Sequence, residues 1–351
     1  MPKGIKIAKL TISQKAELLI NKPLWAGIFI TFLVFLIYGN TLNNGYALDD
    51  HTVISANRYT KKGIEAIPVI FTHAYWYGYD GSNNSVYRPV SLVFFAIEYQ
   101  FFGQNAQISH LVNLLLYSFL CFLLFFIVTD FFESNKSKKG YAFMGLAATL
   151  IFLFHPIHTE VVANIKSRDE ILCFLGLALS VLFMMRQEKS ASIVKKKINQ
   201  TLSALFFLFA LLSKESAFPF IAVFPLVLYF LKNADLKKSL LKTGGHFCVL
   251  IIYLILRISF LEKSFSGNFS NDVMTNSLLA ATNYGERVAT CFFILVKYIL
   301  LLVYPGNLCY DYSFNQIPNL ELTDARAIAS AILIVFLLYI AVKQLKNKTL
   351  L

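Results

Sequence analysis

The feature that most constrains this chain is a succession of long apolar runs separated by short polar connectors. The first is LWAGIFITFLVFLIYGN, at residues 24–40, and others follow as far as residue 342. Hydrophobic residues make up 57% of the chain and charged residues only 15%, whereas a soluble domain carries about a quarter charged residues. One chain cannot hide that much apolar surface from water, so we predict that lipid surrounds much of it.

The runs predict an all-α polytopic membrane protein. We place eight spans at 24–42, 107–132, 140–154, 170–185, 199–213, 217–231, 244–261 and 326–342. The run at 286–304 is interrupted by Arg287 and Lys297, and we expect a re-entrant or interfacial helix there. Several runs fall short of the about 20 residues that a helix needs to cross the hydrocarbon core, so we expect local thinning of the bilayer or snorkelling lysines.

Basic residues cluster in some connectors and are sparse in others. The connectors at 134–140, 186–197 and 232–242 are rich in lysine, which is typical of cytoplasmic loops. This pattern accounts for the net charge of +12 and excludes a nucleic-acid-binding protein. It also predicts a cytoplasmic N-terminal segment, 1–23, and a cytoplasmic basic tail, 346–351. The long segment 43–106 is then the first outer loop, and 262–325 is a later outer region.

The predicted outer side holds most of the residues that can do chemistry. In NNGYALDDHTVISANRY (43–59), two adjacent carboxylates stand a few residues beyond a membrane span. A lone acidic pair is usually solvated surface, but many ionisable groups near one membrane boundary indicate a functional site. The candidates are Asp49, Asp50, Arg88, His155, His158, Glu160, Arg168, Asp169, Lys214, Glu215, Arg287 and Asp311.

Two other features of the predicted outer side leave alternatives open. The aromatic stretch FTHAYWYGYDG (71–81) suits either an interfacial belt or a wall for sugars and lipid head groups. The stretch 87–103 predicts a helix that lies along the membrane surface. His155 and His158 with Glu160 make a divalent metal site conceivable, although this spacing is a weak signal. The five cysteines show no metal-ligand spacing.

Several motifs occur together in one order: the DD pair, YRPVS (87–91), HLVNLLLY (110–117), FHPIHTEVVANIKSRDEIL (154–172), LLSKES (211–216) and PGNLCYDYSF (305–314). In these residues the chain resembles the transmembrane and tetratricopeptide-repeat O-mannosyltransferases and their bacterial relatives, of the GT-C class of glycosyltransferases. The resemblance covers residues 24–345, within a predicted module of 1–345. No tetratricopeptide repeats follow residue 345, so the chain is either a shorter relative or part of a longer one.

The resemblance implies a GT-C-type helix bundle whose long first outer loop carries membrane-surface helices. It also implies transfer of mannose or a similar hexose from a polyprenyl-phosphate carrier to a hydroxyl group. The acceptor is then a Ser or Thr of an exported protein, or a lipid or glycan. The membrane is the bacterial inner membrane with the site facing the periplasm, or the endoplasmic reticulum membrane with the site facing the lumen.

Under this interpretation Asp49 is the general base and Asp50 orients it or binds the acceptor, although the two residues can exchange roles. The donor phosphate and sugar contact Arg88, His155, His158, Arg168, Lys214 and Arg287, because an anionic leaving group needs cations and hydrogen-bond donors. Glu160, Asp169, Glu215 and Asp311 support them. The first three of these are also the alternative partners of the cations, in place of a phosphate. We expect no cofactor, and a divalent metal is the one alternative left open.

Two functions from other classes remain open at this stage. A transporter or flippase would place charges at mid-depth and often shows paired halves, and a membrane assembly protein would share the topology without catalysis. The carboxylate pair opposite a group of cations favours the transferase.

Overall fold

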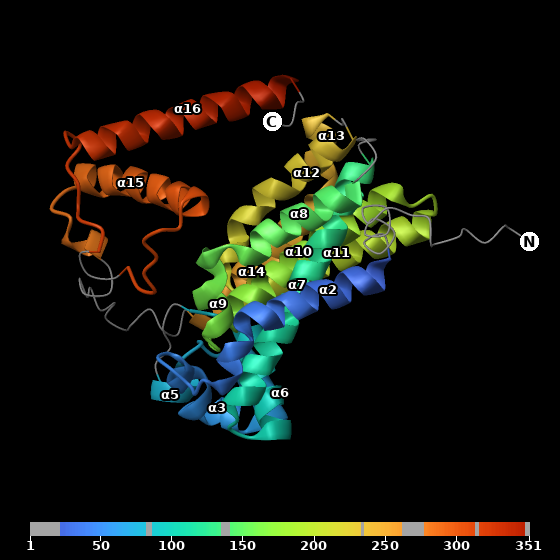
Figure 1. The fold of residues 1–351 in the computed structure, drawn as a ribbon, viewed down its shortest axis with the longest axis vertical. Helices are drawn as coiled ribbons and strands as arrows, with labels where there is room; N and C mark the ends of the chain where they lie inside the picture. The colour runs from blue at the N-terminus through green and yellow to red at the C-terminus, as the bar shows by residue number, and fades with distance from the viewer. Residues whose placement is uncertain are drawn as a thin grey trace, which may run out of the picture. The chain divides into compact units, whose positions relative to one another are not determined.

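The computed structural model describes residues 22–81, 86–134, 141–232, 235–261, 277–312 and 316–347. Throughout these residues the chain is helical or irregular (Figure 1). It divides into two compact units, Met1–Gly267 and Asn268–Leu351, and each is described by itself. Most of the predicted N-terminal segment and of the basic tail, together with 262–276 of the later outer region, lies outside the described residues.

The first unit is a bundle of long helices (Figure 1). They are α2 (Pro23–Tyr38), α7 (Ala106–Ser134), α8 (Tyr141–Phe154), α10 (Arg168–Lys189), α11 (Ile193–Ser213), α12 (Val223–Lys232) and α14 (Gly244–Leu261). α10 is central and packs on both α7 and α11. Its first turn carries Asp169 and Glu170 and its last turn Arg186 and Lys189, which is the charge order that the helix dipole favours.

Helices α10 and α11 approach each other closely at small residues. A Cβ on Gly176 would lie 2.9 Å from the carbonyl oxygen of Phe206. One turn further, the hydroxyls of Ser180 and Ser203 each donate to the other residue's carbonyl oxygen, at 2.8 and 2.7 Å. Small residues let helix backbones meet in an apolar environment, and hydroxyl groups then bond across the interface.

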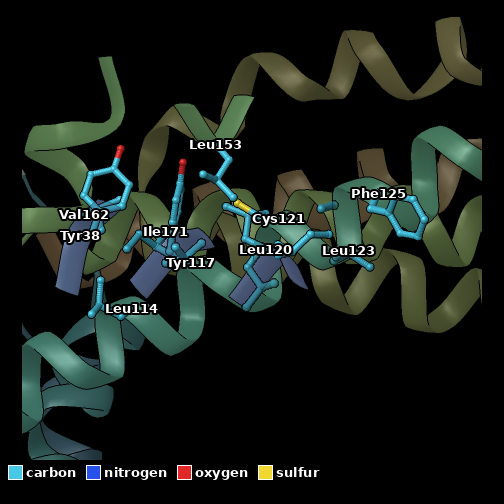
Figure 2. Packing of buried hydrophobic residues seen from close by; sticks show 14 of the residues in the cluster. Tyr38, Leu114, Tyr117, Leu120, Cys121, Leu123, Phe125, Leu153, Val162 and Ile171 are labelled. Carbon is cyan, nitrogen blue, oxygen red and sulfur yellow. The ribbon is translucent and has the colours of Figure 1, made fainter. Parts of the chain in front are cut away.

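The core of the bundle lies between α2, α7, α8 and α10 (Figure 2). Leu114, Leu153 and Ile171 are fully or almost fully buried there. The rings of Tyr38 and Tyr117 meet edge to face, with centroids 5.7 Å apart, a favourable geometry for aromatic pairs. Figure 2 shows that both hydroxyls point to the same side. This core fixes the ends of the helices from which the loops extend.

The segment between α2 and α7 folds into short helices. They are η2 (Gly39–Asn43), η3 (His51–Ser55), α3 (Arg58–Lys61), η4 (Gly63–Ala66), α4 (Ile67–Thr72), α5 (Tyr77–Asp80) and α6 (Pro89–Phe102). They have a core of their own, in which Val53, Ile70 and Tyr75 surround Phe95 of α6 and Ile165 joins from another loop. The surface position predicted for 87–103 stays a prediction, and the structure shows that this helix buries one face in the loop's core.

Two further loops complete the same end of the first unit. After α8 the chain forms η5 (Pro156–His158) and α9 (Thr159–Ala163), and then the turn at residues 164–167 leads into α10. After α11 it forms η6 (Glu215–Ala222), which runs into α12. Because α9 packs on α7 and η6 packs on α10, both loops lie beside the first loop's attachment to the bundle.

Three of the described helical segments are long and apolar enough to cross a membrane: Leu24–Asn43, Ala106–Glu133 and Ala325–Lys346. Two bent pairs raise the number to five if each is one span: Tyr141–Phe154 with Pro156–Ala163, and Leu236–Lys242 (α13) with Gly244–Phe260. An all-α membrane protein is therefore confirmed. The number of eight spans and their orientation stay predictions.

The second unit contains η8 (Ser277–Ala280), α15 (Tyr284–Val303) and α16 (Ala325–Asn347). α15 and α16 pack against each other through Ala289 and Ala327, with Leu320 from the connection between them. The hydroxyl of Thr290 also accepts a hydrogen bond from the backbone N–H of Leu320 at 2.9 Å. α15 is not among the spanning candidates, and its predicted re-entrant or interfacial position stays a prediction.

Candidate active site

The two carboxylates of the acidic pair have different surroundings. The side chain of Asp49 is 57% exposed, whereas Asp50 is 1% exposed. The chain turns at Leu48, whose φ of 49° lies in the left-handed region, uncommon for a residue with a side chain. A π-helical turn, His51–Ser55, follows directly, and such turns occur frequently at functional sites. The backbone thus separates one solvent-facing carboxylate from one buried one.

Asp50 ties the first loop to the turn before α10. Its Oδ2 accepts from the backbone N–H of Ala47 at 2.9 Å, and its Oδ1 accepts from the backbone N–H of Lys166 at 2.7 Å. Burial raises the pKa of Asp50 above its ordinary value, and the two N–H donors and the charge of Arg168 oppose this only in part. Asp50 therefore serves as an anchor and is shielded from solvent.

A second set of contacts fixes the same turn from behind. Asn113 of α7 donates from Nδ2 to the carbonyl oxygens of Asn164 and Ile165, at 3.2 and 3.4 Å. Its Oδ1 accepts from Nε of Arg168 at 2.7 Å. The asparagine of the HLVNLLLY motif thus supports the SRDE motif, and the turn is held on both sides by side chains distant in sequence.

Arg168 is bound entirely within the protein. It is 0% exposed, its Nη1 lies 2.8 Å from Oε2 of Glu98, and its Nη2 donates to the carbonyl oxygen of Ser109 at 2.9 Å. Its guanidinium also lies over the ring of Phe95, 4.5 Å from the centroid. The structure therefore favours support of the turn over the predicted phosphate contact for Arg168, because Nε and Nη2 already donate to protein oxygens and Nη1 faces Glu98 in a site closed to solvent.

Two further candidate cations, Arg88 and Lys214, gather around Asp169, which is fully buried. Arg88 donates from Nη1 to Oδ2 of Asp169 at 2.7 Å, and it holds Glu215 through Nε, at 2.8 Å, and Nη2. Lys214 lies 3.4 Å from Oδ1 of Asp169 and 2.7 Å from Oε1 of Glu170. Three loops thus bring charges of both signs to one place. From the sequence, the alternative to a bound phosphate was that acidic side chains pair with these cations. The structure shows such acidic partners for Arg88 and Lys214.

These contacts perturb the ionisation of the side chains involved. Burial alone would lower the pKa of Arg88 and of Lys214, but the neighbouring carboxylates more than reverse this, so both pKa values are raised. Burial would raise the pKa of Glu215, but Arg88 outweighs it and brings that pKa to about 2. Arg88, Lys214 and Glu215 are therefore charged at neutral pH, and fixed charges of this kind are what an electrostatic site uses.

Lys166 joins this cluster to the acidic pair, and our sequence predictions did not include it. Its Nζ lies 3.8 Å from Oδ2 of Asp49 and 4.0 Å from Oδ2 of Asp169. Its side chain is 16% exposed. The one available signal was its place in the NIKSRDE motif, three residues before Asp169.

The two histidines and Glu160 lie on the neighbouring loop. The ring centroids of His155 and His158 are 6.0 Å apart, and Nδ1 of His155 accepts from the backbone N–H of Ile157. Oε1 of Glu160 instead accepts from Asn164 and Ser167, at 3.0 and 3.1 Å. Glu160 thus supports the turn, and the described residues contain no group of three or more metal-ligating side chains placed to hold a metal ion.

The last two predicted residues, Arg287 and Asp311, lie in the second unit and are both exposed. Arg287 is in the first turn of α15, whose N-terminus is capped by the side chain of Asn283. Their predicted roles as phosphate contact and support stay predictions.

Comparison with known proteins matches this sequence to one set of relatives. A family profile described as Protein O-mannosyl-transferase TMTC, DUF1736, matches residues 274–338, which include the PGNLCYDYSF motif. The chain is 27% identical over 324 residues to Protein O-mannosyl-transferase F38B6.6 of Caenorhabditis elegans. It is 26% identical over 356 residues to Protein O-mannosyl-transferase TMTC4 of Mus musculus and 27% identical over 311 residues to Protein O-mannosyl-transferase TMTC2 of Homo sapiens.

These alignments cover 90%, 89% and 81% of this chain but only 43%, 46% and 35% of the three relatives. The chain thus spans less than half the length of each. No solved structure matches it. The resemblance that we predicted from the motifs is confirmed: over most of its length, this chain is similar to proteins named protein O-mannosyl-transferases.

Proposed function

We propose that this chain is a membrane glycosyltransferase of the GT-C class. It transfers mannose or a similar hexose from a polyprenyl-phosphate carrier to a Ser or Thr hydroxyl of a protein. The observation that carries the proposal is the exposed carboxylate of Asp49, held by a buried anchor beside a charged cluster built from three loops. The names of the relatives supply the reaction class.

The acceptor step needs a base, because an alcohol has a pKa far above 7. A carboxylate within hydrogen-bond reach takes the proton as the hydroxyl oxygen attacks the anomeric carbon. The bond between that carbon and the phosphate oxygen breaks, and its electron pair leaves with the polyprenyl phosphate. Asp49 is the base because its carboxylate is exposed, whereas Asp50 is buried and committed to two backbone N–H groups.

The leaving group is an anion, so catalysis requires positive charge where the negative charge develops. The cluster around Asp169 supplies three cations, Arg88, Lys166 and Lys214. The carboxylates of Glu215 and Glu170 hold two of them in position. The site faces the outer side of the membrane, which is the periplasm in a bacterium or the lumen of the endoplasmic reticulum in a eukaryote.

The test is transfer by the purified protein in nanodiscs, with labelled polyprenyl-phosphate mannose and a Ser/Thr peptide. We expect Asp49→Asn to slow transfer by about 10²- to 10⁴-fold, the contribution typical of a general base. Glu65→Gln is the matched control, because Glu65 is an exposed carboxylate of the same loop, in the first turn of η4.

A single displacement also inverts the anomeric configuration, which NMR of the product measures. Normal turnover in Asp49→Asn, together with loss of transfer in a folded Asp50→Asn, would move the base to Asp50. Wild-type protein that transfers no sugar from this donor would overturn the proposed function.

A further inference from the structure

The cations of the candidate site differ in how fully their hydrogen-bond donors are used. Arg88 makes three hydrogen bonds to carboxylates. Arg168 is bound to Glu98, Asn113 and Ser109, and the ammonium of Lys214 lies 2.7 Å from Glu170. Each of these charges is held by close partners, so a new anion would compete with them.

Lys166 differs from the other three. The two carboxylates that its ammonium faces, on Asp49 and Asp169, lie 3.8 and 4.0 Å away, beyond the about 3.2 Å limit of an ordinary N–H···O hydrogen bond. An ammonium carries three donors. Lys166 therefore has its charge and all three donors available for a further anion, whereas Arg88, Arg168 and Lys214 already have partners at 2.7 or 2.8 Å.

The position of Lys166 combines a fixed backbone with a long side chain. Its backbone N–H is bonded to Asp50, and the preceding residues 164 and 165 are bonded to Asn113. The side chain is 16% exposed and ends between an exposed carboxylate and a buried one. This arrangement fixes the backbone of Lys166, while rotation about the bonds of its four-carbon side chain lets the ammonium move.

We propose that Lys166 is an exchangeable cation that pairs with Asp49 when no donor is bound and moves to the phosphate when the donor binds. This inference rests on the proposed function and assigns the donor phosphate to one residue. Transfer of the ammonium to the phosphate leaves Asp49 free to receive the acceptor proton. The same ammonium then neutralises the oxygen that gains the electron pair when the sugar–phosphate bond breaks. Binding of the donor and release of the base are thereby coupled.

The first test measures binding of polyprenyl phosphate, without sugar, to the 351-residue chain in nanodiscs. We expect Lys166→Met to weaken binding about 10- to 100-fold, the loss typical of one hydrogen bond to a charged group, and Lys166→Arg to restore most of it. The uncharged polyprenol should bind wild type and Lys166→Met equally. Lys61→Met is the matched control, because Lys61 is an exposed lysine of the first loop.

The second test is a double-mutant cycle. Its expected result differs from the result that a purely structural ion pair would give. If Asp49 competes with the phosphate for the ammonium, Asp49→Asn should tighten polyprenyl phosphate binding about two- to five-fold, as expected for a solvent-exposed pair. That gain should vanish when Lys166→Met is already present.

Two outcomes overturn the inference separately from the proposed function. Wild-type transfer with unchanged phosphate affinity in Lys166→Met would assign the phosphate to another residue and leave the function intact. Additive effects of Asp49→Asn and Lys166→Met would refute the exchange between the two anions. Wild-type protein that neither binds polyprenyl phosphate nor transfers sugar would refute both.

Discussion

At the scale of single residues, burial separates side chains that the sequence presents as equivalent. Asp49 and Asp50 are neighbours, but only Asp49 is exposed. Lys166 and Arg168 are two residues apart, but only Arg168 is sealed from solvent. An ionised group that is fully buried must keep its partners, because the uncompensated charge is very costly. The fully buried member of each pair therefore supports the fold, and the substrate roles proposed above belong to the more accessible member.

The burial of Arg168 predicts how the Glu98–Arg168 pair responds to mutation. Glu98→Gln removes the charge that faces the buried guanidinium, and loss of one partner of a buried ion pair costs about 3–5 kcal/mol. We expect a clearly lower melting temperature in detergent. The double variant Glu98→Gln/Arg168→Met should recover much of the loss, because no charge is then left unpaired. If the single variant is as stable as wild type, the reassignment of Arg168 to a supporting role is incorrect.

At the scale of elements, one helix connects the candidate site to the bundle. α10 begins at the cluster with Arg168 and Asp169 and then runs between α7 and α11. Its close approach to α11 at Gly176 fixes its axis. Lys214 follows α11 directly. The distance between Asp169 and Lys214 therefore depends on how closely α10 and α11 pack at Gly176.

Gly176→Ala should disturb this packing. The added methyl would lie 2.9 Å from a backbone carbonyl oxygen, which cannot move aside as a flexible side chain can. Overpacking of this kind costs about 1–3 kcal/mol, which offsets or exceeds the roughly 1 kcal/mol by which alanine favours a helix over glycine. Gly245→Ala in α14, where an added Cβ meets nothing within 4 Å, is the control and should be stabilising. Equal melting temperatures for the two variants would contradict the close approach.

At the scale of the whole molecule, orientation in the membrane is what the proposed function most depends on. Asp49 must face the side on which exported proteins are modified. The lysine-rich connectors predict that side, because positive charge is retained in the cytoplasm. The first loop and the C-terminal tail are then on opposite sides of the membrane.

Single cysteines test this orientation in whole cells, after the five native cysteines have been replaced. Lys62→Cys is a suitable probe, because Lys62 is exposed, whereas Asn57 on the same loop is buried and caps α3. We expect an impermeant thiol reagent to label position 62 and to leave Thr349→Cys unlabelled until the cells are opened. The reverse pattern would overturn both the topology and the mechanism.

The apolar runs predicted the long helices well, because burial in lipid leaves a strong and local signal in the sequence. Of the short helices of residues 43–106, the one at 87–103 was predicted. The others were not, since their ends are fixed by side chains such as Asn57, which accepts from the N–H groups of Tyr59 and Thr60. For the same reason the motifs located the candidate site but could not rank its cations. Whether Arg168 or Lys166 is buried depends on Glu98 and Asn113, which lie more than 50 residues away in the chain.

The bond from Asp50 to the backbone of Lys166 also sets an order of events during synthesis. The two residues are 116 positions apart, and at about 5–20 residues per second the ribosome takes roughly 6–23 s to cover that distance. Throughout this interval the acidic loop has already emerged but lacks the turn that anchors it. The nascent chain therefore lacks the anchored turn until α7 and α8 have been made and the start of α10 follows. Under the proposed function, an incomplete chain would not consume the donor.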